Sequence, residues 1–472
     1  MKGMKTVLSF SLGGLLLLGG CSLAPEYARP DAPVPASWPA GPAYDNAPVS
    51  AAAPAAEELP WREFFTDERL RKVIGMALEN NRDLRTAALN VERARALYGI
   101  QRSELYPTVD ASAAGSKRRV PADLSSGGEV SRPEEYSVGV GIGSWELDFF
   151  GRIRSLKDAA LEEYLATEQA RRGAQLLLVS GVANAYLALA ADRETLRLAR
   201  STMETQQASF DLIRKRYEVG LSPELDLRQA QSRVDAARAD AAFFVQRAAQ
   251  DENALNLLVG SPVPAELLPA DLEAVSPPKE IFAGLPSDVL LRRPDILAAE
   301  SRLKGADANI GAARAALFPR ISLTTSFGTS SAELSRLFDS GQSTWSFAPR
   351  IVTPIFDARS WYALRAVKVE REIAVAQYEK AIQSAFREVA DALAAKGTIE
   401  EQLAAQRSLT DAVADTYRLS NLRYEKGIDS FLGVLDAQRS LYAAQQGLIA
   451  VRLARYANQV NLYSVLGGGS DR

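Results

Sequence analysis

The chain has 472 residues but no histidine, and it contains a single cysteine. Without histidine it lacks the commonest general base and the commonest transition-metal ligand. One cysteine excludes disulfide bonds within the chain and thiolate metal clusters. The sequence also contains no phosphate-binding glycine loop and no nucleophile elbow. We therefore expect no enzymatic activity, no metal site and no cofactor.

The chain also lacks a large excess of either positive or negative charge. The 55 basic and 58 acidic residues leave a formal charge of −3, and the longest basic run is Lys117-Arg118-Arg119. Nucleic-acid binding needs a basic surface, so nucleic acid is not expected as a partner. The hydrophobic content of 47% is enough to bury a large core.

Long hydrophobic runs are also rare. The apolar run from Val7 to Leu18 is too short to span a bilayer and is typical of a signal peptide. Leu18-Gly19-Gly20-Cys21 resembles a bacterial lipobox, which predicts a lipoprotein signal peptide at residues 1–20 and a covalent lipid on Cys21. An incidental cysteine in a leader is the alternative. Ser22, and not Asp, follows the cysteine, and this sorting pattern points to the outer membrane.

The sequence contains one unit twice. Arg216-Tyr217-Glu218-Val219-Gly220 recurs 207 residues later as Arg423-Tyr424-Glu425-Lys426-Gly427. Leu105-Tyr106-Pro107 recurs 212 residues later as Leu317-Phe318-Pro319, so the second copy is five residues shorter between these blocks. A repeat of this length predicts pseudo-twofold symmetry within one chain.

Each copy is predicted to contain one β-hairpin. After Pro107 and after Pro319 the apolar residues change from a helical period to a period of two. The hairpins are expected at about 108–148 and about 320–356, the second running on to Phe356, each with a long polar loop. Alternation with long loops is typical of a transmembrane β-barrel. A soluble antiparallel sheet with one wet face remains the alternative.

Each hairpin is followed by a long helical stretch. No proline occurs from Arg152 to Val219, and about sixty helical residues would reach roughly 90 Å, which exceeds the thickness of any bilayer. Return helices are expected after Pro223 and Ser430, and their apolar residues repeat every seven positions. This period is typical of coiled-coil packing.

The turns between these helices are predicted to be exposed. The glycine in each turn either caps a helix or helps to form a surface for a partner, and both roles are compatible. The turn residues expected to form this partner-facing surface are Gly220, Leu221, Ser222, Gly427, Ile428 and Asp429.

The resulting domain layout follows the repeat. We expect the signal peptide at 1–20, a lipidated Pro/Ala-rich N-terminal tether at 21–60, the first repeat at 61–260, a linker at 261–285, the second repeat at 286–468, and a C-terminal tail at 469–472.

Four strands cannot close into a barrel, and an open sheet edge in a membrane leaves backbone groups unpaired. Identical chains could close the sheet, with eight strands from two chains or twelve from three. We therefore expect an α+β membrane protein in which an oligomeric transmembrane β-barrel continues into a long periplasmic α-helical coiled-coil barrel. Such a hollow shape suggests a conduit.

Several blocks resemble one known family, and the likeness covers nearly all of the chain. The chain is similar to the outer-membrane factors of tripartite efflux pumps, most of all to the OprM branch of the TolC-like family. The resemblance implies a homotrimer that docks onto a periplasmic adaptor protein and, through it, an inner-membrane pump of the resistance-nodulation-division (RND) type. The blocks are Trp145–Arg152, Leu291–Ile296, Gly311–Pro319 and Leu435–Leu441.

The resemblance also implies a periplasmic gate. In OprM-like proteins a Leu and an Asp four residues apart close the entrance, and these match Leu432 and Asp436 here. Three Asp436 side chains around an axis would repel one another and attract cations. The alternative is an ordinary surface aspartate near a helix start. The first copy has Leu225 and Gln229 at these positions, so the repeat differs in charge there.

Two carboxylates near the end of the first hairpin have two interpretations. Glu146 and Asp148 could act as an acid/base pair. We favour a structural ion pair with Arg152 or Arg154, because Gly151-Arg152 is expected to be a structural strand–helix junction.

The function predicted from these features is that of an outer-membrane channel: a passive duct, lipid-anchored and transmembrane, which exports antibiotics and other small toxic compounds. One alternative is a duct for protein secretion or metal-ion export, and the four methionines argue against metal. The other is a coiled-coil envelope scaffold lipoprotein without a pore.

Overall fold

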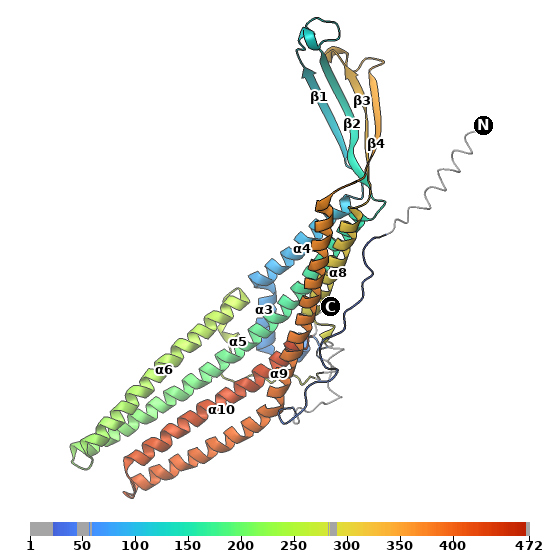
Figure 1. Ribbon diagram of the computed structural model, residues 1–472. Coiled ribbons are helices and arrows are strands. Elements are labelled where there is room, and N and C mark those ends of the chain that lie inside the picture. Colours follow the sequence, from blue (N-terminus) through green and yellow to red (C-terminus); the bar gives the residue numbers. More distant parts are fainter. Residues whose placement is uncertain (1–21, 45–55, 57–58, 282, 284–289, 469–472) are drawn as a thin grey trace. The chain divides into compact units, whose positions relative to one another are not determined.

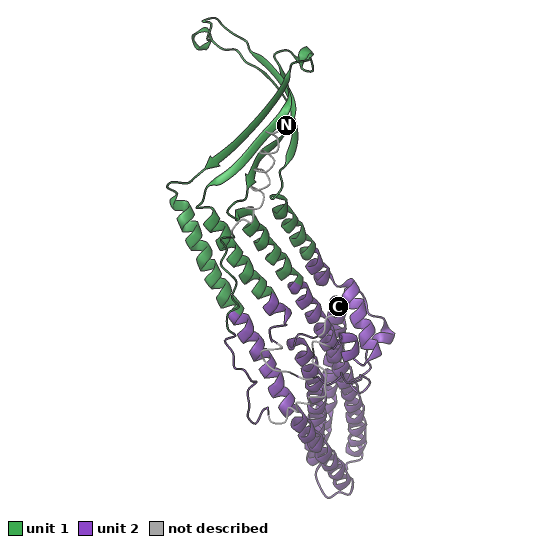
Figure 2. Cartoon of the chain, turned by 90° about the vertical axis from the view of Figure 1, so that its right-hand side faces the viewer, with its two compact units in different colours: residues 1–31, 90–168, 298–378 green, residues 32–89, 169–297, 379–472 purple. Residues whose placement is uncertain are grey.

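The structure is a computed structural model that describes residues 22–44, 56, 59–281, 283 and 290–468 (Figure 1). The predicted signal peptide, Cys21 and the predicted tail at 469–472 lie outside the described residues. The chain forms two compact units. Unit 1 comprises the described parts of residues 1–31, 90–168 and 298–378, and unit 2 those of 32–89, 169–297 and 379–472 (Figure 2).

Unit 1 contains a four-stranded antiparallel sheet in the order β1-β2-β3-β4. The strands are β1 (Val109–Lys117), β2 (Glu134–Leu147), β3 (Arg320–Ser331) and β4 (Ser343–Val352). The two predicted hairpins are confirmed, and β2 pairs with β3 to join them. β4 ends at Val352, short of the predicted Phe356. Pro354 lies between them and has no N–H to extend a ladder.

The two faces of the sheet differ sharply in polarity. Val140, Phe327 and Trp345 lie side by side on one face through the β2–β3 and β3–β4 pairings. On the other face Gly141 lies opposite Ser326, whose hydroxyl is 2.7 Å from that of Ser346. The sheet thus alternates an apolar face with a face of small polar residues, a pattern typical of transmembrane β-barrels.

The seam between the hairpins requires glycine. Gly139 lies opposite Gly328 across the β2–β3 pairing. A Cβ atom built on Gly328 would meet the carbonyl oxygen of Val138, and one on Gly141 that of Thr325, closer than real Cβ atoms come. The adjacent backbones therefore approach too closely for any side chain at these two positions.

Unit 1 also holds the start of the described chain against a helix. α4 (Arg82–Ser103) precedes β1, and α8 (Pro294–Ala315) precedes β3. Arg29 binds both carboxylate oxygens of the buried Glu300 at 3.0 and 2.9 Å, and Arg314 donates to the carbonyl of Leu23 at 2.9 Å. Residues 22–31 thus pack along α8, and Ala24 fills the space above Gly311.

The long helices match their predicted extent. α5 (Arg152–Glu218) and α9 (Ala358–Glu425) have 67 and 68 residues, and α6 (Glu224–Val259) and α10 (Phe431–Val465) return from them. α6 buries Ala230, Val234, Ala237 and Ala241, which confirms that part of the predicted apolar period.

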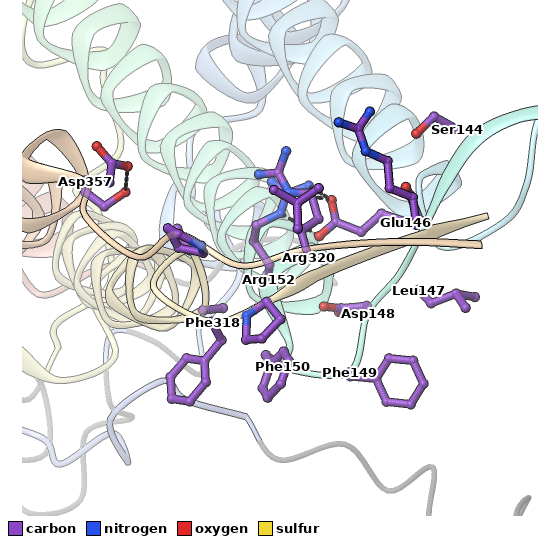
Figure 3. Close-up of a pocket in the computed structure, with 18 residues that line it drawn as sticks. Ser144, Glu146, Leu147, Asp148, Phe149, Phe150, Arg152, Phe318, Arg320 and Asp357 are labelled. Atoms are coloured by element: carbon purple, nitrogen blue, oxygen red, sulfur yellow. Dashed lines mark hydrogen bonds and ion pairs between the residues drawn. The ribbon is translucent and has the colours of Figure 1, made fainter. Parts of the chain in front are cut away.

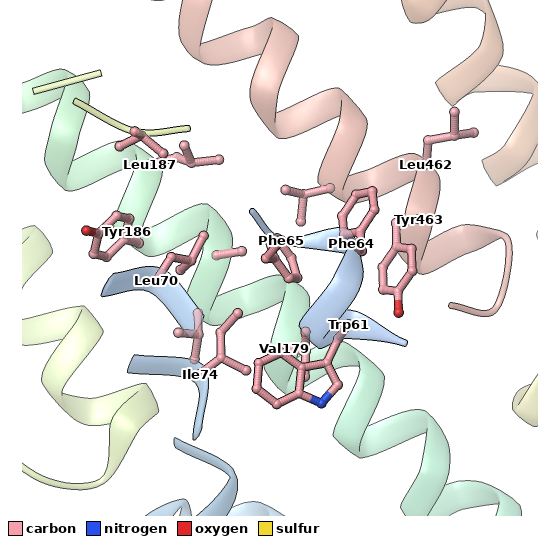
Figure 4. Close-up of a cluster of buried hydrophobic side chains, with 14 of the residues drawn as sticks. Trp61, Phe64, Phe65, Leu70, Ile74, Val179, Tyr186, Leu187, Leu462 and Tyr463 are labelled. Atoms are coloured by element: carbon pink, nitrogen blue, oxygen red, sulfur yellow. The ribbon is translucent and has the colours of Figure 1, made fainter. Parts of the chain in front are cut away.

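The core of unit 2 gathers around two short helices, α2 (Trp61–Phe64) and α3 (Glu68–Asn80) (Figure 4). Phe64 stacks on Tyr463 of α10 with ring centroids 4.1 Å apart, and the Tyr463 hydroxyl donates to the Leu59 carbonyl at 2.9 Å. Among the described helices, α5 alone is long and apolar enough to cross a membrane by length and composition. Its residues Leu178 to Ala191 contribute many side chains to this core, which accounts for its apolarity.

Candidate functional site

The turns that end α5 and α9 have the same backbone structure. Gly220 donates to the Tyr217 carbonyl at 2.9 Å, and Leu221 to the Arg216 carbonyl at 2.7 Å. The second turn repeats both bonds: Gly427 to Tyr424 at 2.9 Å, and Ile428 to Arg423 at 2.9 Å. Both glycines have positive φ angles, 75° and 72°. These are Schellman caps, so the C-cap role is confirmed in both copies.

Each turn exposes a large apolar side chain among polar neighbours. Leu221 is 70% exposed and Ile428 61% exposed. Single exposed apolar residues are common on protein surfaces, so this exposure permits a contact with a partner without requiring one. The role of the two turns in binding an adaptor stays a prediction.

The side chains of the two turns differ although the backbones agree. In the second turn Arg423 forms an ion pair with Asp429 at 2.5 Å, and this bond lowers the pKa of the Asp429 carboxyl. In the first turn Ser222 stands at the corresponding position, and its hydroxyl bonds Asp226 at 3.2 Å.

Just inside the turns, one apolar cluster joins the two helical hairpins. Its buried members come from α5, α6 and α10, and Tyr424 of α9 packs against them, 5.2 Å from the ring of Phe431. Arg216 of α5 lies over the Tyr424 ring, 5.3 Å from its centroid. The buried members are Ile213, Ala230, Phe431, Val434 and Leu435.

The predicted gate residues lie on one exposed stripe at the start of α10. Leu432 is 57% exposed and Asp436 lies one turn further along the same side. Asp436 accepts a bond from Arg439 at 2.8 Å, and both side chains are exposed. Sequence reasoning missed Arg439, although its spacing of three residues from Asp436 favours an ion pair. The opposite side of α10 is buried in the cluster, which leaves this stripe for contacts outside the chain.

The strand–helix junction of the first hairpin is held by ion pairs (Figure 3). Arg152 donates to both oxygens of Glu146 at 2.8 Å, and Arg154 bonds Asp148 at 3.2 Å. The bond to Glu146 raises the pKa of the Arg152 guanidinium. The structural ion pair is therefore confirmed, and Gly151 makes the turn with a φ of 76°.

Sequence reasoning missed a third cation at this junction. Arg320, the first residue of β3, lies 3.3 Å from Glu146, so one carboxylate ties the first hairpin to the second. These residues line a hollow of about 550 Å³, with Phe150 stacked on Phe318 at 4.9 Å. Within the described residues, no group of three or more His, Cys, Asp or Glu side chains is placed to hold a metal ion.

Comparison with known proteins agrees with this architecture. The model of the family described as "Outer membrane efflux protein" matches residues 73–261 and 285–468. The chain is 50% identical over 467 residues to the "Antibiotic efflux pump outer membrane protein ArpC" of Pseudomonas putida, covering 98% of this chain and 96% of that protein. The same figures hold for the "Toluene efflux pump outer membrane protein TtgC" of the same species.

A solved structure shares the fold. The open state of the MtrE outer membrane channel of Neisseria gonorrhoeae superposes with a TM-score of 0.85 at 39% identity, covering 95% of this chain and 98% of that one. The class defined by fold and sequence is that of the TolC-like outer-membrane channels. The chain belongs to the outer membrane efflux protein family, and its role is that of an outer-membrane efflux duct.

Proposed function

We propose that three copies of the chain close into a twelve-stranded barrel that crosses the outer membrane. Within the described chain, the outer edges of β1 and β4 have no strand partner. An unpaired edge in hydrocarbon costs several kcal/mol for each free backbone group, so the edges must meet those of other copies. This open pair of edges is the observation that carries the proposal.

The apolar face of the sheet supports a membrane environment. Phe327, Trp345 and Phe347 are all largely exposed on it. Beyond the helix-side end of β4, Phe356 and Trp361 are exposed as well. Exposed aromatic side chains at both ends of an apolar band are typical of the interface girdles of outer-membrane barrels.

In this proposal the duct is passive and lipid-anchored at Cys21. Solutes enter at the helix turns, which meet a periplasmic adaptor protein and an inner-membrane pump of the RND type. The gate is formed by Leu432 and Asp436 from each of the three chains. The names of the relatives, an antibiotic pump and a toluene pump, support antibiotics and small apolar toxic compounds as cargo.

Native mass spectrometry of the detergent-extracted, lipidated protein tests the assembly. We expect a complex of three chains that heating converts to monomers. A disruptive variant, Ala113→Pro, tests the pairing of β1. Proline has no N–H to donate to a ladder, so it is tolerated in a strand only where no such bond is needed. The variant should lower the yield of the complex. A monomer or dimer from the folded wild-type protein would contradict the proposal.

A further inference from the structure

The loop end of the β1–β2 hairpin brings two arginines directly opposite each other. β1 and β2 pair without a register shift as far as Lys117. Beyond the strands, Val120 and Ser131 exchange two backbone hydrogen bonds, at 2.8 and 3.1 Å, in the same register. Arg119 and Arg132 are therefore cross-strand partners at the position just before this pair.

The two positive charges should repel each other unless a negatively charged group lies between them. Hydrogen-bonded and non-hydrogen-bonded pairs alternate in an antiparallel ladder, and Val120–Ser131 is a hydrogen-bonded pair. Arg119 and Arg132 thus form the closer, non-hydrogen-bonded kind, with Cβ atoms about 4.5–5.5 Å apart. Like charges directly opposite destabilise a hairpin. Both side chains are exposed, and within the part of the chain that the structure describes neither makes an ion pair.

Strand alternation places both arginines on the apolar face of the sheet. Arg132 shares its face with Tyr136 and Val138, and Arg119 shares its face with Ala113. The next pair towards the apolar band, Lys117 with Glu134, is already neutralised by an ion pair. Within the β1–β2 hairpin, the arginines are therefore the outermost strand charges on the face that meets lipid in the proposed barrel.

The height of the pair fits the phosphate level of a membrane. Tyrosine rings of barrel girdles lie at the boundary between hydrocarbon and headgroups. Arg132 lies four residues beyond Tyr136, which is about 14 Å along a strand and about 10 Å in height at the usual tilt of about 45°. The headgroup layer extends about 5–8 Å beyond the hydrocarbon. The Cα atoms of the pair therefore lie just outside this layer, and the long arginine side chains can reach back to the phosphates. The hairpin loop lies at the end of the sheet away from the helices of unit 1 (Figure 2).

The other charges of the β1–β2 hairpin leave the pair available. Arg118 and Glu135 have the opposite strand parity and so belong to the inner face. Asp123 and Glu129 lie in the loop beyond the Val120–Ser131 bridge. Guanidinium groups bind phosphate through two parallel N–H···O bonds, and two such groups on one surface match a phosphate or a phosphorylated sugar.

We propose that Arg119 and Arg132 form a binding site for the phosphate of a phosphorylated glycolipid in the leaflet at the loop end of the barrel. The proposal rests on the barrel placement given above. The bound phosphate would relieve the repulsion between the two arginines and fix the depth and lateral contacts of the hairpin.

Native mass spectrometry of the full-length complex with added lipid tests the site. The probe is bis-phosphorylated lipid A, compared with its dephosphorylated form and with inorganic phosphate. Wild type should retain the phosphorylated lipid, and Arg119→Gln/Arg132→Gln should weaken retention at least tenfold. Arg119→Lys/Arg132→Lys should give an intermediate loss, because the charge remains but the bidentate geometry does not. Arg118→Gln on the inner face is the matched control and should bind as wild type does.

Three results would overturn the proposal: equal retention by the double glutamine variant, equal retention of dephosphorylated lipid, or displacement of the lipid by millimolar inorganic phosphate. Conductance of the double glutamine variant in a planar bilayer separates the hypothesis of the phosphate site from that of the duct. A conducting variant that loses the lipid supports the site, a conducting variant that keeps it contradicts the site alone, and a wild type without conductance contradicts the duct.

Discussion

The helix turns of the two repeat copies share their backbone hydrogen bonds and differ in the side chains that would control flow. The Schellman caps at Gly220 and Gly427 have the same hydrogen bonds and nearly the same φ angle. At the start of the return helices, however, the second copy has Asp436 bound to Arg439, while the first has Gln229. Backbone geometry is thus repeated wherever a turn demands it, and charge is free to diverge where packing does not decide it.

A second difference lies in the buried part of the return helices. Asp251 of α6 aligns with Asn458 of α10. Burial and the neighbouring carboxylate of Asp192 raise the pKa of Asp251 to about 6, although Arg247 opposes this. Asn458 instead donates to the Ala392 carbonyl at 3.1 Å. The first copy therefore contains a carboxyl group whose charged form is disfavoured, and the second copy has an uncharged amide at the same position.

The largest expected effect comes from breaking the seam that joins the copies. Gly141→Ala should destabilise the assembled sheet by about 1–3 kcal/mol, because its Cβ would overlap the Thr325 carbonyl. Gly143→Ala, further along the same strand, has its nearest atom at 4.0 Å and should be nearly neutral. The temperature at which the complex dissociates on a gel measures both. Equal behaviour of the two variants would show that the seam does not need glycine.

The next effect tests whether the turns are equivalent. Gly220→Ala and Gly427→Ala meet no atom within 4 Å, so only the left-handed backbone opposes them. Each should destabilise its turn by about 1 kcal/mol. Hydrogen exchange of the turn amides, read by mass spectrometry, should rise by the same factor in both. A difference above about fivefold would mean that the copies are not alike in the backbone.

The smallest expected effect comes from a substitution that makes the two copies alike at Asp251 and Asn458. Asp251→Asn should stabilise the protein at pH 7.5 by about 1 kcal/mol after allowance for solvent screening, because a raised pKa means that the folded state disfavours the charged carboxylate. The penalty is absent below the ordinary pKa of aspartate, near 4, and complete above about pH 6. Thermal unfolding across this range should show the variant's advantage appear as the pH rises.

Asp235→Asn, which removes an exposed carboxylate on the same helix, is the matched control for the loss of one negative charge. A gain in stability from Asp251→Asn that did not change with pH would contradict the proposed cost of charging the Asp251 carboxyl.

The sequence was sufficient to predict the local structure. Pro107, Gly220 and Gly427 act through their own backbones, so the strand starts and helix ends could be predicted from residue types alone. The contacts between distant segments could not. The pairing of β2 with β3, the bond of Arg320 to Glu146 and the clamp of Arg29 on Glu300 depend on the packing of whole elements, and no local pattern encodes them.

We propose that the gate of the duct is formed by the second copy of the repeat and not by the first. Single-channel conductance in a planar bilayer tests this proposal by comparing wild type with Leu432→Ala/Asp436→Ala and with the matched pair Leu225→Ala/Gln229→Ala. We expect a small wild-type conductance, a severalfold increase in the second-copy variant and little change in the first-copy variant. Equal increases in both variants, or no conductance from well-folded complexes, would contradict it.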